Sequence, residues 1–477
     1  MVSYESSSIY GACSEDTNRW RSLTGITGSV YGVFRKNASG MHILTEVKLH
    51  SLPLLRYKGK RVRMENKDDA RDREVLHSIW PPVGSESLSW QRDVDELSFI
   101  PKSRRRAITS TYDAAVPAYI GDLSPELSRH LLMRVADLAG DLARFDALQE
   151  HRGFDLPALL LRSESAASSQ IENLTSSVRN VALAELAADA PHNAQLIAGN
   201  VAAMRAALTL PGKTSVESIL EMHRTLINRA GNTFGGEIRN EQVWVGGTPY
   251  SPHGALYVPP SASRVRPLLD DLVSFAVRDD IQPLAKATVV HAQFETIHPF
   301  IDGNGRTGRV LLHKMLRDDG VLRRTTLPVS AGLLHDVDGY MRAIAAYQSG
   351  DLAPVLEQVL DALEISLALG GTVAARFDGV IEAWREIMTE RAGSSIRKLP
   401  SVLVEQPVVN VPYVANKLGV SERAARTVVE RACEYGMLQP MGNRRRGVFY
   451  QADRLIEILE EISSAQGIRR VLSGGIR

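Results

Sequence analysis

Apolar residues recur at helical spacing through the central part of the chain. Ser124 and the proline after it predict the start of a long amphipathic helix. Residues 214–217 (Thr-Ser-Val-Glu) have the pattern of a capping box that opens another helix. The stretches 283–297 and 306–317 also predict helices, so we expect this part of the chain to be mainly α-helical. The apolar positions that follow Ser124 at intervals of three and four are Leu127, Leu131, Val135, Leu138, Leu142 and Phe145.

One stretch within this helical region has strand character. Residues 241–247 (Glu-Gln-Val-Trp-Val-Gly-Gly) favour a strand, 248–255 are rich in Pro, Gly and Ser, and 256–258 (Leu-Tyr-Val) lead into two prolines. Two strand-forming runs around a turn-rich segment predict a β-hairpin. The pattern alone leaves open whether this hairpin binds a partner, because Trp244 and Tyr257 could simply anchor it.

The C-terminal eighty residues predict a separate module. A short helix over 411–418, a turn at Gly419 and a second helix capped by Ser421 form a helix-turn-helix pattern. Residues 437–450 then place Gly-Asn-Arg-Arg-Arg-Gly between β-compatible ends, which resembles the wing of a winged helix.

This module is a candidate DNA-binding surface. Arg423 and Arg426 on the second helix could enter a major groove, and the arginines at 444–446 could hold phosphates. Docking of a protein, or pairing of two copies of the chain, remains an alternative role for the same fold.

Composition excludes several classes of protein. The chain has 477 residues, enough for about three domains of roughly 150 residues each. Its net charge of +1 gives no reason to expect nucleic acid or membrane binding over the whole surface. Cys13 and Cys433 lie too far apart in sequence to suggest a zinc site. Because no apolar run approaches the ~20 residues of a membrane helix, we expect a cytoplasmic protein with no membrane partner.

Segment 298–309, with the sequence HPFIDGNGRTGR, contains the parts of a nucleotide-phosphate site. Gly303–Gly305 allows successive backbone N–H groups to face one point at the start of a helix, where the positive end favours an anion. Asp302 is a hard oxygen ligand suited to Mg²⁺. Arg306 and Arg309 lie about one helical turn apart and can grip the outer phosphates.

His298 stands directly before this cradle, and imidazole, with an unperturbed pKa of about 6.5, suits proton abstraction near neutral pH. The whole segment resembles the Fic family signature HPFx(D/E)GNGRxxR and matches it at every defined position. The resemblance implies transfer of AMP from ATP to a Ser, Thr or Tyr hydroxyl of a protein. It also implies the role of each residue: His298 as base, Asp302 as Mg²⁺ ligand, Gly303, Asn304 and Gly305 as anion hole, and Arg306 and Arg309 as ATP ligands, with Arg309 on the γ-phosphate.

A second motif implies autoinhibition. Residues 168–173 (Ser-Ser-Gln-Ile-Glu-Asn) fit the pattern (S/T)xxxE(G/N) of the Fic inhibitory helix. Ser168 and Glu172 are four residues apart, so on a helix they share a face. The resemblance implies that Glu172 pairs with Arg309 and keeps it from the γ-phosphate. A short Ser-x-x-x-Glu pattern also occurs on ordinary surface helices, and its place before the core motif is what favours the inhibitory role.

The same resemblance gives the predicted hairpin a function as a flap that adds a target segment as an extra strand. Its target-binding residues would be Val243, Trp244, Val245 and Gly246.

The predicted fold is mainly α: a Fic-type helical core with a β-hairpin flap, followed by a C-terminal winged helix-turn-helix domain. We expect an N-terminal segment of unclear fold (1–105), a helical region with the inhibitory helix (106–200), the Fic core (201–375), and a linker helix with the winged helix (376–477). Within residues 1–105, the runs 30–33 and 43–47 suggest a weak hairpin.

Two classes of function compete. The first is a protein adenylyltransferase with protein substrates, itself among them. The second is a DNA-binding regulator whose Fic domain senses nucleotide or removes AMP. The intact set of His298, Asp302 and Arg309 favours the enzyme, because a binding module has no physical need for it. Gly305 favours AMP transfer over phosphorylation, because kinases of the Doc type carry lysine there. Phosphocholine transfer, the target protein and homo-oligomer formation stay open.

Overall fold

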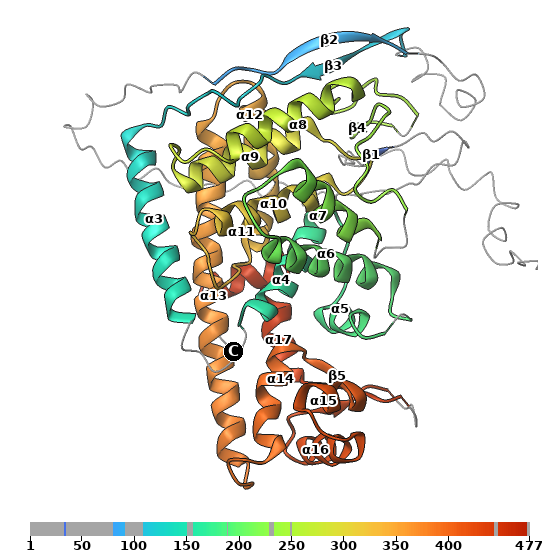
Figure 1. Ribbon diagram of the computed structural model, residues 1–477, viewed down its shortest axis with the longest axis vertical. Helices are drawn as coiled ribbons and strands as arrows, with labels where there is room; N and C mark the ends of the chain where they lie inside the picture. Colours follow the sequence, from blue (N-terminus) through green and yellow to red (C-terminus); the bar gives the residue numbers. More distant parts are fainter. Residues whose placement is uncertain are drawn as a thin grey trace, which may run out of the picture.

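The structure is a computed structural model that describes residues 33–34, 80–90, 108–149, 156–187, 189–228, 233–248, 250–442 and 447–474. This part of the chain is mainly helical, as the sequence predicts, and it has three small antiparallel sheets, of which the sheet of residues 84–89 and 111–116 was not predicted. The long helix α13 runs along the helical body and reaches the C-terminal module (Figure 1).

The helices of the body and the C-terminal module follow in chain order. They are α3 (Arg129–Leu148), α4 (Leu156–Ile171), α5 (Val178–Ala184), α6 (His192–Thr209), α7 (Val216–Asn228), α8 (Ala262–Ala276), α9 (Pro283–Ile297), α10 (Asn304–Asp318), α11 (Val329–His335), α12 (Val337–Gln348), α13 (Ala353–Ile387), η3 (Ser395–Lys398), α14 (Leu399–Glu405), α15 (Val411–Leu418), α16 (Glu422–Glu434), α17 (Asp453–Glu461) and α18 (Ala465–Leu472).

The strands are short. A hairpin of β2 (Gly84–Ser89) and β3 (Thr111–Val116) crosses one end of the body, and β1 (Val33–Phe34) pairs with β4 (Trp244–Val245). The third sheet has the order β5-β7-β6 and belongs to the C-terminal module. Its strands are β5 (Val408–Asn410), β6 (Gln439–Pro440) and β7 (Phe449–Gln451).

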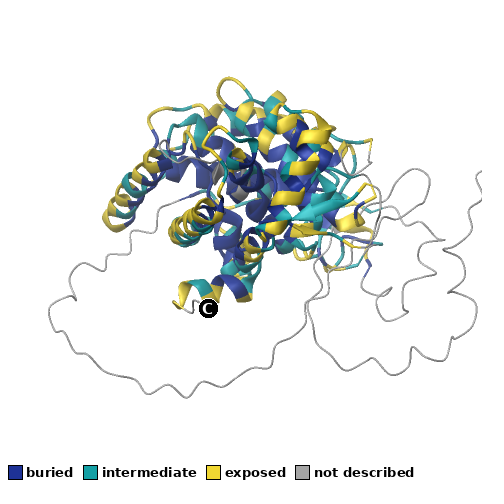
Figure 2. Ribbon diagram, turned by 90° about the horizontal axis from the view of Figure 1, so that it is seen from below, coloured by how far each residue is buried: buried dark blue, intermediate teal, exposed yellow. Residues whose placement is uncertain are grey.

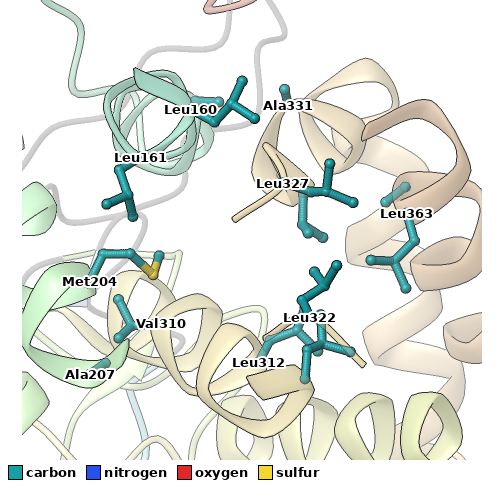
Figure 3. Close-up of a cluster of buried hydrophobic side chains, with 14 of the residues drawn as sticks. Leu160, Leu161, Met204, Ala207, Val310, Leu312, Leu322, Leu327, Ala331 and Leu363 are labelled. Carbon is teal, nitrogen blue, oxygen red and sulfur yellow. The ribbon is translucent and has the colours of Figure 1, made fainter. Parts of the chain in front are cut away.

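Helix α9 lies at the centre of the core and is buried on nearly every side. Its neighbours include α8, α10, α12 and α13, and its polar residues Lys286, His291 and Gln293 are buried together with its apolar ones. Figure 2 shows that buried residues are concentrated in the interior of the helical body. A further part of the core joins α4 to α6, α10 and α11, through side chains such as Leu161, Met204 and Val310 (Figure 3). Strong packing on both sides of α10 fixes the position of the segment at its N-terminus.

Two predicted helix starts are wrong by a few residues. Helix α3 begins at Arg129, where Ser128 accepts a hydrogen bond from the Leu131 N–H at 3.3 Å, and not at Ser124. The Ser124 hydroxyl instead accepts from the Arg278 guanidinium. A local cap signal could not reveal this long-range contact.

The capping box of α7 is shifted by one residue. Ser215 and Ser218 exchange backbone-to-hydroxyl hydrogen bonds of 2.9 and 3.1 Å, whereas Thr214 and Glu217 were the predicted pair. Thr214 donates its hydroxyl to Asp318 on α10. The helix itself begins at Val216, inside the predicted stretch.

The C-terminal module has the helix, turn, helix and hairpin that the sequence predicts. Ser421 caps α16 by accepting from the Ala424 N–H at 3.3 Å, and Gly419 ends α15 with a φ of 65°. Beyond the hairpin, α17 and α18 return to the body and pack on α4, α5, α11 and α13. The arginines at 444–446 lie outside the described residues.

Helix α13 is long and apolar enough to span a membrane by length and composition, although no such stretch was expected from the sequence. Half of its most apolar part is buried inside the protein, as in the core helix of a soluble fold.

Much of the N-terminal segment lies outside the described residues, including the expected hairpin strand at 43–47. Strand β2, which belongs to the predicted segment 1–105, pairs with β3 across that boundary.

Candidate active site

The predicted phosphate cradle is the loop that joins α9 to α10. His298 ends α9 in the left-handed region, with φ 51° and ψ 63°, and Gly303 precedes α10 with φ 77°. The side chain of Asn304 accepts from the Phe300 N–H and donates to the Phe300 carbonyl, both at 2.8 Å. This side chain therefore braces the loop, so only the backbone of Asn304 can contribute to the predicted anion hole.

His223 on α7 fixes the same loop from the other side, and no motif in the sequence includes it. Its Nδ1 accepts from the Gly236 N–H at 2.9 Å, so its Nε2 carries the proton and donates to the Asp302 carbonyl at 3.0 Å. The ring stacks on Phe300 with centroids 3.6 Å apart. Burial lowers the pKa of His223 to about 4, which keeps this arrangement neutral.

A cavity of about 580 Å³ opens in front of the loop. Its wall contains His298, Asp302, the Gly303–Gly305 backbone and Arg309, together with Glu172. The structure thus brings together residues from two separate stretches of sequence. Arg306 is 4% exposed and lies behind this wall.

The His298 imidazole faces this cavity as a free base. Its Nε2 is buried and has no hydrogen-bond partner among the described residues, while Nδ1 lies 3.4 Å from the Glu295 carbonyl. Burial, and then the positive charge of Arg239, lower the pKa of His298 to about 4. The ring is therefore neutral near pH 7 and can accept a proton on Nε2.

Glu172 lies against both motif arginines. It follows the last residue of α4 directly, and its carboxylate accepts from Arg309 Nη2 and from Arg306 Nε, each at 2.8 Å. The sequence predicted only the Arg309 pair. Ser168 adds two contacts, because Arg309 donates to its hydroxyl at 2.8 Å and to its carbonyl at 2.7 Å. Ser168 and Glu172 therefore accept the hydrogen bonds of Arg309, the side chain that was expected to bind the γ-phosphate.

The carboxylate also lies over the glycine cradle. A Cβ on Gly305 would be only 2.6 Å from Glu172 Oε1 and 2.9 Å from Arg309 Nη1. An anion thus already occupies the space in front of the Gly305 backbone, where the cradle was expected to hold a phosphate.

Asp302 fits a magnesium site supplied mainly by phosphates and water. Its side chain is 44% exposed and lines the cavity. Oδ1 accepts from the Gly303 N–H at 2.7 Å, and Arg306 approaches both oxygens only to 3.4 Å. Oδ2 is thus available to a cation. Among the described residues there is no cluster of three or more His, Cys, Asp or Glu side chains that could hold a metal alone, and Mg²⁺ at nucleotides does not require one.

Glu295 is a second residue of the site that the sequence did not indicate. Its Oε1 is buried without a hydrogen-bond partner among the described residues, and burial raises the pKa of this carboxyl to about 7. A Cβ at Gly308 would lie 2.4 Å from Oε1. A side chain at Gly308, which is not a defined position of the signature, would therefore displace the Glu295 carboxyl group.

The predicted flap is present, although it is less regular than a hairpin. The Val245 N–H donates to the Tyr257 carbonyl at 2.8 Å, and the Leu256 N–H donates to the Val245 carbonyl at 2.8 Å. Val245 lines the cavity, whereas Val243 and Trp244 are 0% and 2% exposed. Those two side chains anchor the flap and are too buried to contact a target. Any target contact by Val243 or Trp244 would be made by the main chain, and that contact stays a prediction.

Residues 213–316 match the family described as Fic/DOC family. Among curated relatives, protein adenylyltransferase fic-1 of Caenorhabditis elegans is 33% identical over 154 residues, which are 32% of this chain and 28% of the relative. Protein adenylyltransferase Fic of Drosophila willistoni is 28% identical over 169 residues, 35% of this chain and 31% of the relative. The chain thus spans about a third of the length of these relatives.

Among solved structures, a Fic family protein from Desulfovibrio desulfuricans G20 is similar to 69% of this chain and 97% of its own, with a TM-score of 0.45 and 22% identity. The family match covers α7, the flap, α8, α9 and nearly all of α10. Of these elements, the flap, the end of α9, the loop after it and the start of α10 line the cavity, whereas α12 and the segment after α4, which also line it, lie outside the match. The chain therefore contains a Fic/DOC family domain at residues 213–316.

Proposed function

We propose that this protein is an adenylyltransferase that moves AMP from ATP to a hydroxyl group of a protein. The observation that carries the proposal is the unpartnered Nε2 of a neutral His298 in the same cavity as a glycine cradle at a helix N-terminus. A base beside an anion site is what attack of a hydroxyl on a phosphate requires. The curated relatives named protein adenylyltransferase support the choice of AMP as the transferred group.

The reaction follows from the chain's own groups. His298 Nε2 accepts the proton of the target hydroxyl as its oxygen attacks the α-phosphorus of ATP. The bond from that phosphorus to the bridging oxygen breaks, so pyrophosphate leaves and AMP stays on the target. Backbone N–H groups of Gly303–Gly305 and the positive end of α10 stabilise the negative charge on the α-phosphate. Mg²⁺ held by Asp302 would neutralise phosphate charge when bound.

In the conformation described, the enzyme is inhibited by its own Glu172. The carboxylate occupies the cradle at Gly305 and accepts from Nη2 of Arg309, so this arginine is not available to the γ-phosphate. ATP in such a site would leave its α-phosphorus out of line with His298. Activation therefore requires Glu172 to leave the two arginines.

We also propose that the target is a protein segment that adds to the flap as an extended strand. Strand β4 accepts such a neighbour, since β1 of this chain pairs with it antiparallel, with Val33 opposite Val245. Main-chain hydrogen bonds of this kind bind a segment with little dependence on its sequence. Self-modification is then an expected side reaction.

A direct experiment is incubation of the full chain with α-labelled ATP and a cell lysate, wild type beside Glu172→Gly. Label in protein bands that appears with Glu172→Gly, and disappears when His298→Ala is added, supports the proposal. No transfer of label with Glu172→Gly, in spite of measured ATP binding, contradicts it and favours a nucleotide sensor.

DNA binding by the C-terminal module is the second candidate function. In its favour, Arg423 and Arg426 are exposed on α16, and neither forms an ion pair with another described residue. Binding of a labelled duplex that weakens steeply with salt, and is lost in the Arg423→Ala and Arg426→Ala double variant, would support this function. Salt-independent or absent binding would leave the module as a protein-docking surface.

A further inference from the structure

The guanidinium of Arg239 joins the flap to the catalytic base. This side chain is 2% exposed, and the sequence analysis did not identify it. Its Nε donates to the His298 carbonyl at 2.8 Å, and its Nη1 donates to the Glu241 carbonyl at 3.1 Å. Its Nη2 donates to the Pro260 carbonyl.

These three carbonyls lie at the two ends of the flap and at the catalytic base. Glu241 is where the chain enters the flap, Pro260 is where it leaves, and His298 is the base at the end of α9. The backbone N–H of Arg239 also donates to the Pro299 carbonyl at 3.0 Å. One rigid planar group thus holds both ends of the flap at a fixed distance from the left-handed residue that carries the imidazole.

We propose that Arg239 is the positioning residue that aligns a target hydroxyl with His298, and that its buried charge keeps His298 a base. The kinetic part of this inference rests on the proposed adenylyl transfer. A target strand on β4 can present its hydroxyl to Nε2 only if the flap and the base keep one register, and Arg239 is the described side chain that contacts the backbone of both.

Arginine suits this position better than lysine. Its fork presents five N–H donors in fixed directions, so it can satisfy carbonyls of three segments at once. The ammonium group of lysine, at the end of a flexible side chain, reaches fewer of these carbonyls in any one rotamer. A lysine substitution therefore keeps the charge while it loses the geometry, which separates the two parts of the proposal.

The charge of Arg239 has no carboxylate partner among the described residues, and its hydrogen bonds go to carbonyl oxygens alone. Burial lowers its pKa to about 10, so it remains charged near pH 7. An uncompensated cation beside His298 disfavours a second positive charge on the imidazolium, because screening is weak in a buried site. After burial itself, Arg239 is the larger cause of the lowered pKa of His298.

Other charged or titratable groups surround His298, and they remain in place when Arg239 is changed. Glu172 favours the imidazolium, but only while it occupies the cavity. The groups that line the same cavity or its wall are Glu172 after α4, Tyr257 on the flap, Glu295 on α9, Asp302 in the loop, Arg306 and Arg309 on α10, and Asp338, Tyr340 and Arg342 on α12.

The test uses the full chain in the Glu172→Gly background, with Arg239→Gln and Arg239→Lys. Arg264→Gln is the matched control, because Arg264 follows the flap on α8 but pairs with Glu86 of β2, at 2.7 Å. The measurements are kcat and KM for a target peptide, Kd for ATP, and the titration of the His298 imidazole by NMR. The NMR titration also works in protein that transfers no AMP.

We expect Arg239→Gln to lower kcat by about 10²-fold with less than about threefold change in Kd for ATP, since the base and target lose alignment and the phosphate site does not. The His298 titration should rise toward its usual value of about 6.5. Arg239→Lys should keep the low titration point and still lose kcat by about 10-fold or more. Arg264→Gln should change none of these quantities.

An Arg239→Gln protein with the kcat and His298 titration of the control overturns the proposal. Equal loss in ATP affinity and kcat for both Arg239 variants would also overturn it, because that pattern indicates general disruption of the fold. If Arg239→Gln fails to fold, Arg239→Lys alone decides: wild-type kcat in that variant refutes the alignment role. If Glu172→Gly transfers no AMP at all, the proposed function fails, while the NMR titration still decides the role of the Arg239 charge.

Discussion

Replacement of Glu172 by glycine should activate the enzyme. The side chain of Glu172 is 27% exposed, whereas those of Arg306 and Arg309 are 4% and 3% exposed. Its two hydrogen bonds to these arginines are charge-assisted and 2.8 Å long. Removal of the carboxylate frees Arg309 Nη2 and clears the space above Gly305.

The size of the effect follows from a population shift. One charge-assisted hydrogen bond contributes about 1.5–3 kcal/mol, and the released arginines regain contact with water or phosphate. If the inhibited conformation is favoured by that amount, the competent one is present at about 1–8%. A variant that is always in the competent conformation should therefore transfer AMP about 10- to 100-fold faster. ATP affinity should rise less, because the obstruction misplaces the α-phosphate more than it excludes the nucleotide.

The assay is incorporation of label from α-labelled ATP into the protein and its targets, at saturating ATP, for wild type, Glu172→Gly, Arg309→Ala and the double variant. Glu172→Gln is the matched control, since it keeps the size of the side chain and removes its charge, and an intermediate rate is expected. The double variant should fall back to low activity because the freed arginine is missing. Equal rates for wild type and Glu172→Gly at saturating substrates would refute the inhibitory role.

Three further predictions follow from the same contacts. His298→Ala should reduce transfer by about 10²-fold or more while ATP binding largely survives, and calorimetry beside the transfer assay checks this; a wild-type rate would contradict the base assignment. Asp302→Ala should abolish the dependence of ATP binding on Mg²⁺, and an unchanged ratio of Kd with and without chelator would exclude it as the ligand. Arg162→Gln should lower the free energy of unfolding by about 3 kcal/mol, because Arg162 forms a buried pair with Glu185. Arg162 also holds α4 to the C-terminal module, because it donates to the Glu405 carbonyl at 2.6 Å and to Gln406 Oε1 at 2.7 Å. The same variant should therefore raise AMP transfer only while Glu172 is present; an equal rise in Glu172→Gly would refute this coupling.

The sequence was most informative where spacing and chemistry coincide. The sequence predicted α9 to the residue, as Pro283–Ile297, because a proline opens it and the motif begins directly after it. The motif also identified part of the cavity wall, since all of its predicted site residues except Arg306 line the cavity. The second half of the Glu172 contact, to Arg306, was missed because spacing on one helix does not reveal how another helix packs against it.

What the sequence could not show depends on contacts between distant segments. His223 lies 79 residues before Asp302 in the chain, and their hydrogen bond forms only after α7 packs beside α10. Glu295 is on a helix that is buried on nearly all sides, so no polar face marked it as a site residue. Arg239 lies among several polar residues in the sequence, so nothing distinguishes it there. Only the folded structure shows that its N–H groups donate to carbonyls of three segments.

The most direct test of the central claim is mass spectrometry of the intact Glu172→Gly protein after incubation with ATP and Mg²⁺, followed by fragmentation to locate the modification. We expect the added mass of AMP on a Ser, Thr or Tyr oxygen, and no addition when His298 is replaced by alanine. A phosphoryl group in place of AMP, or an unmodified protein that binds ATP in the cavity, would contradict it.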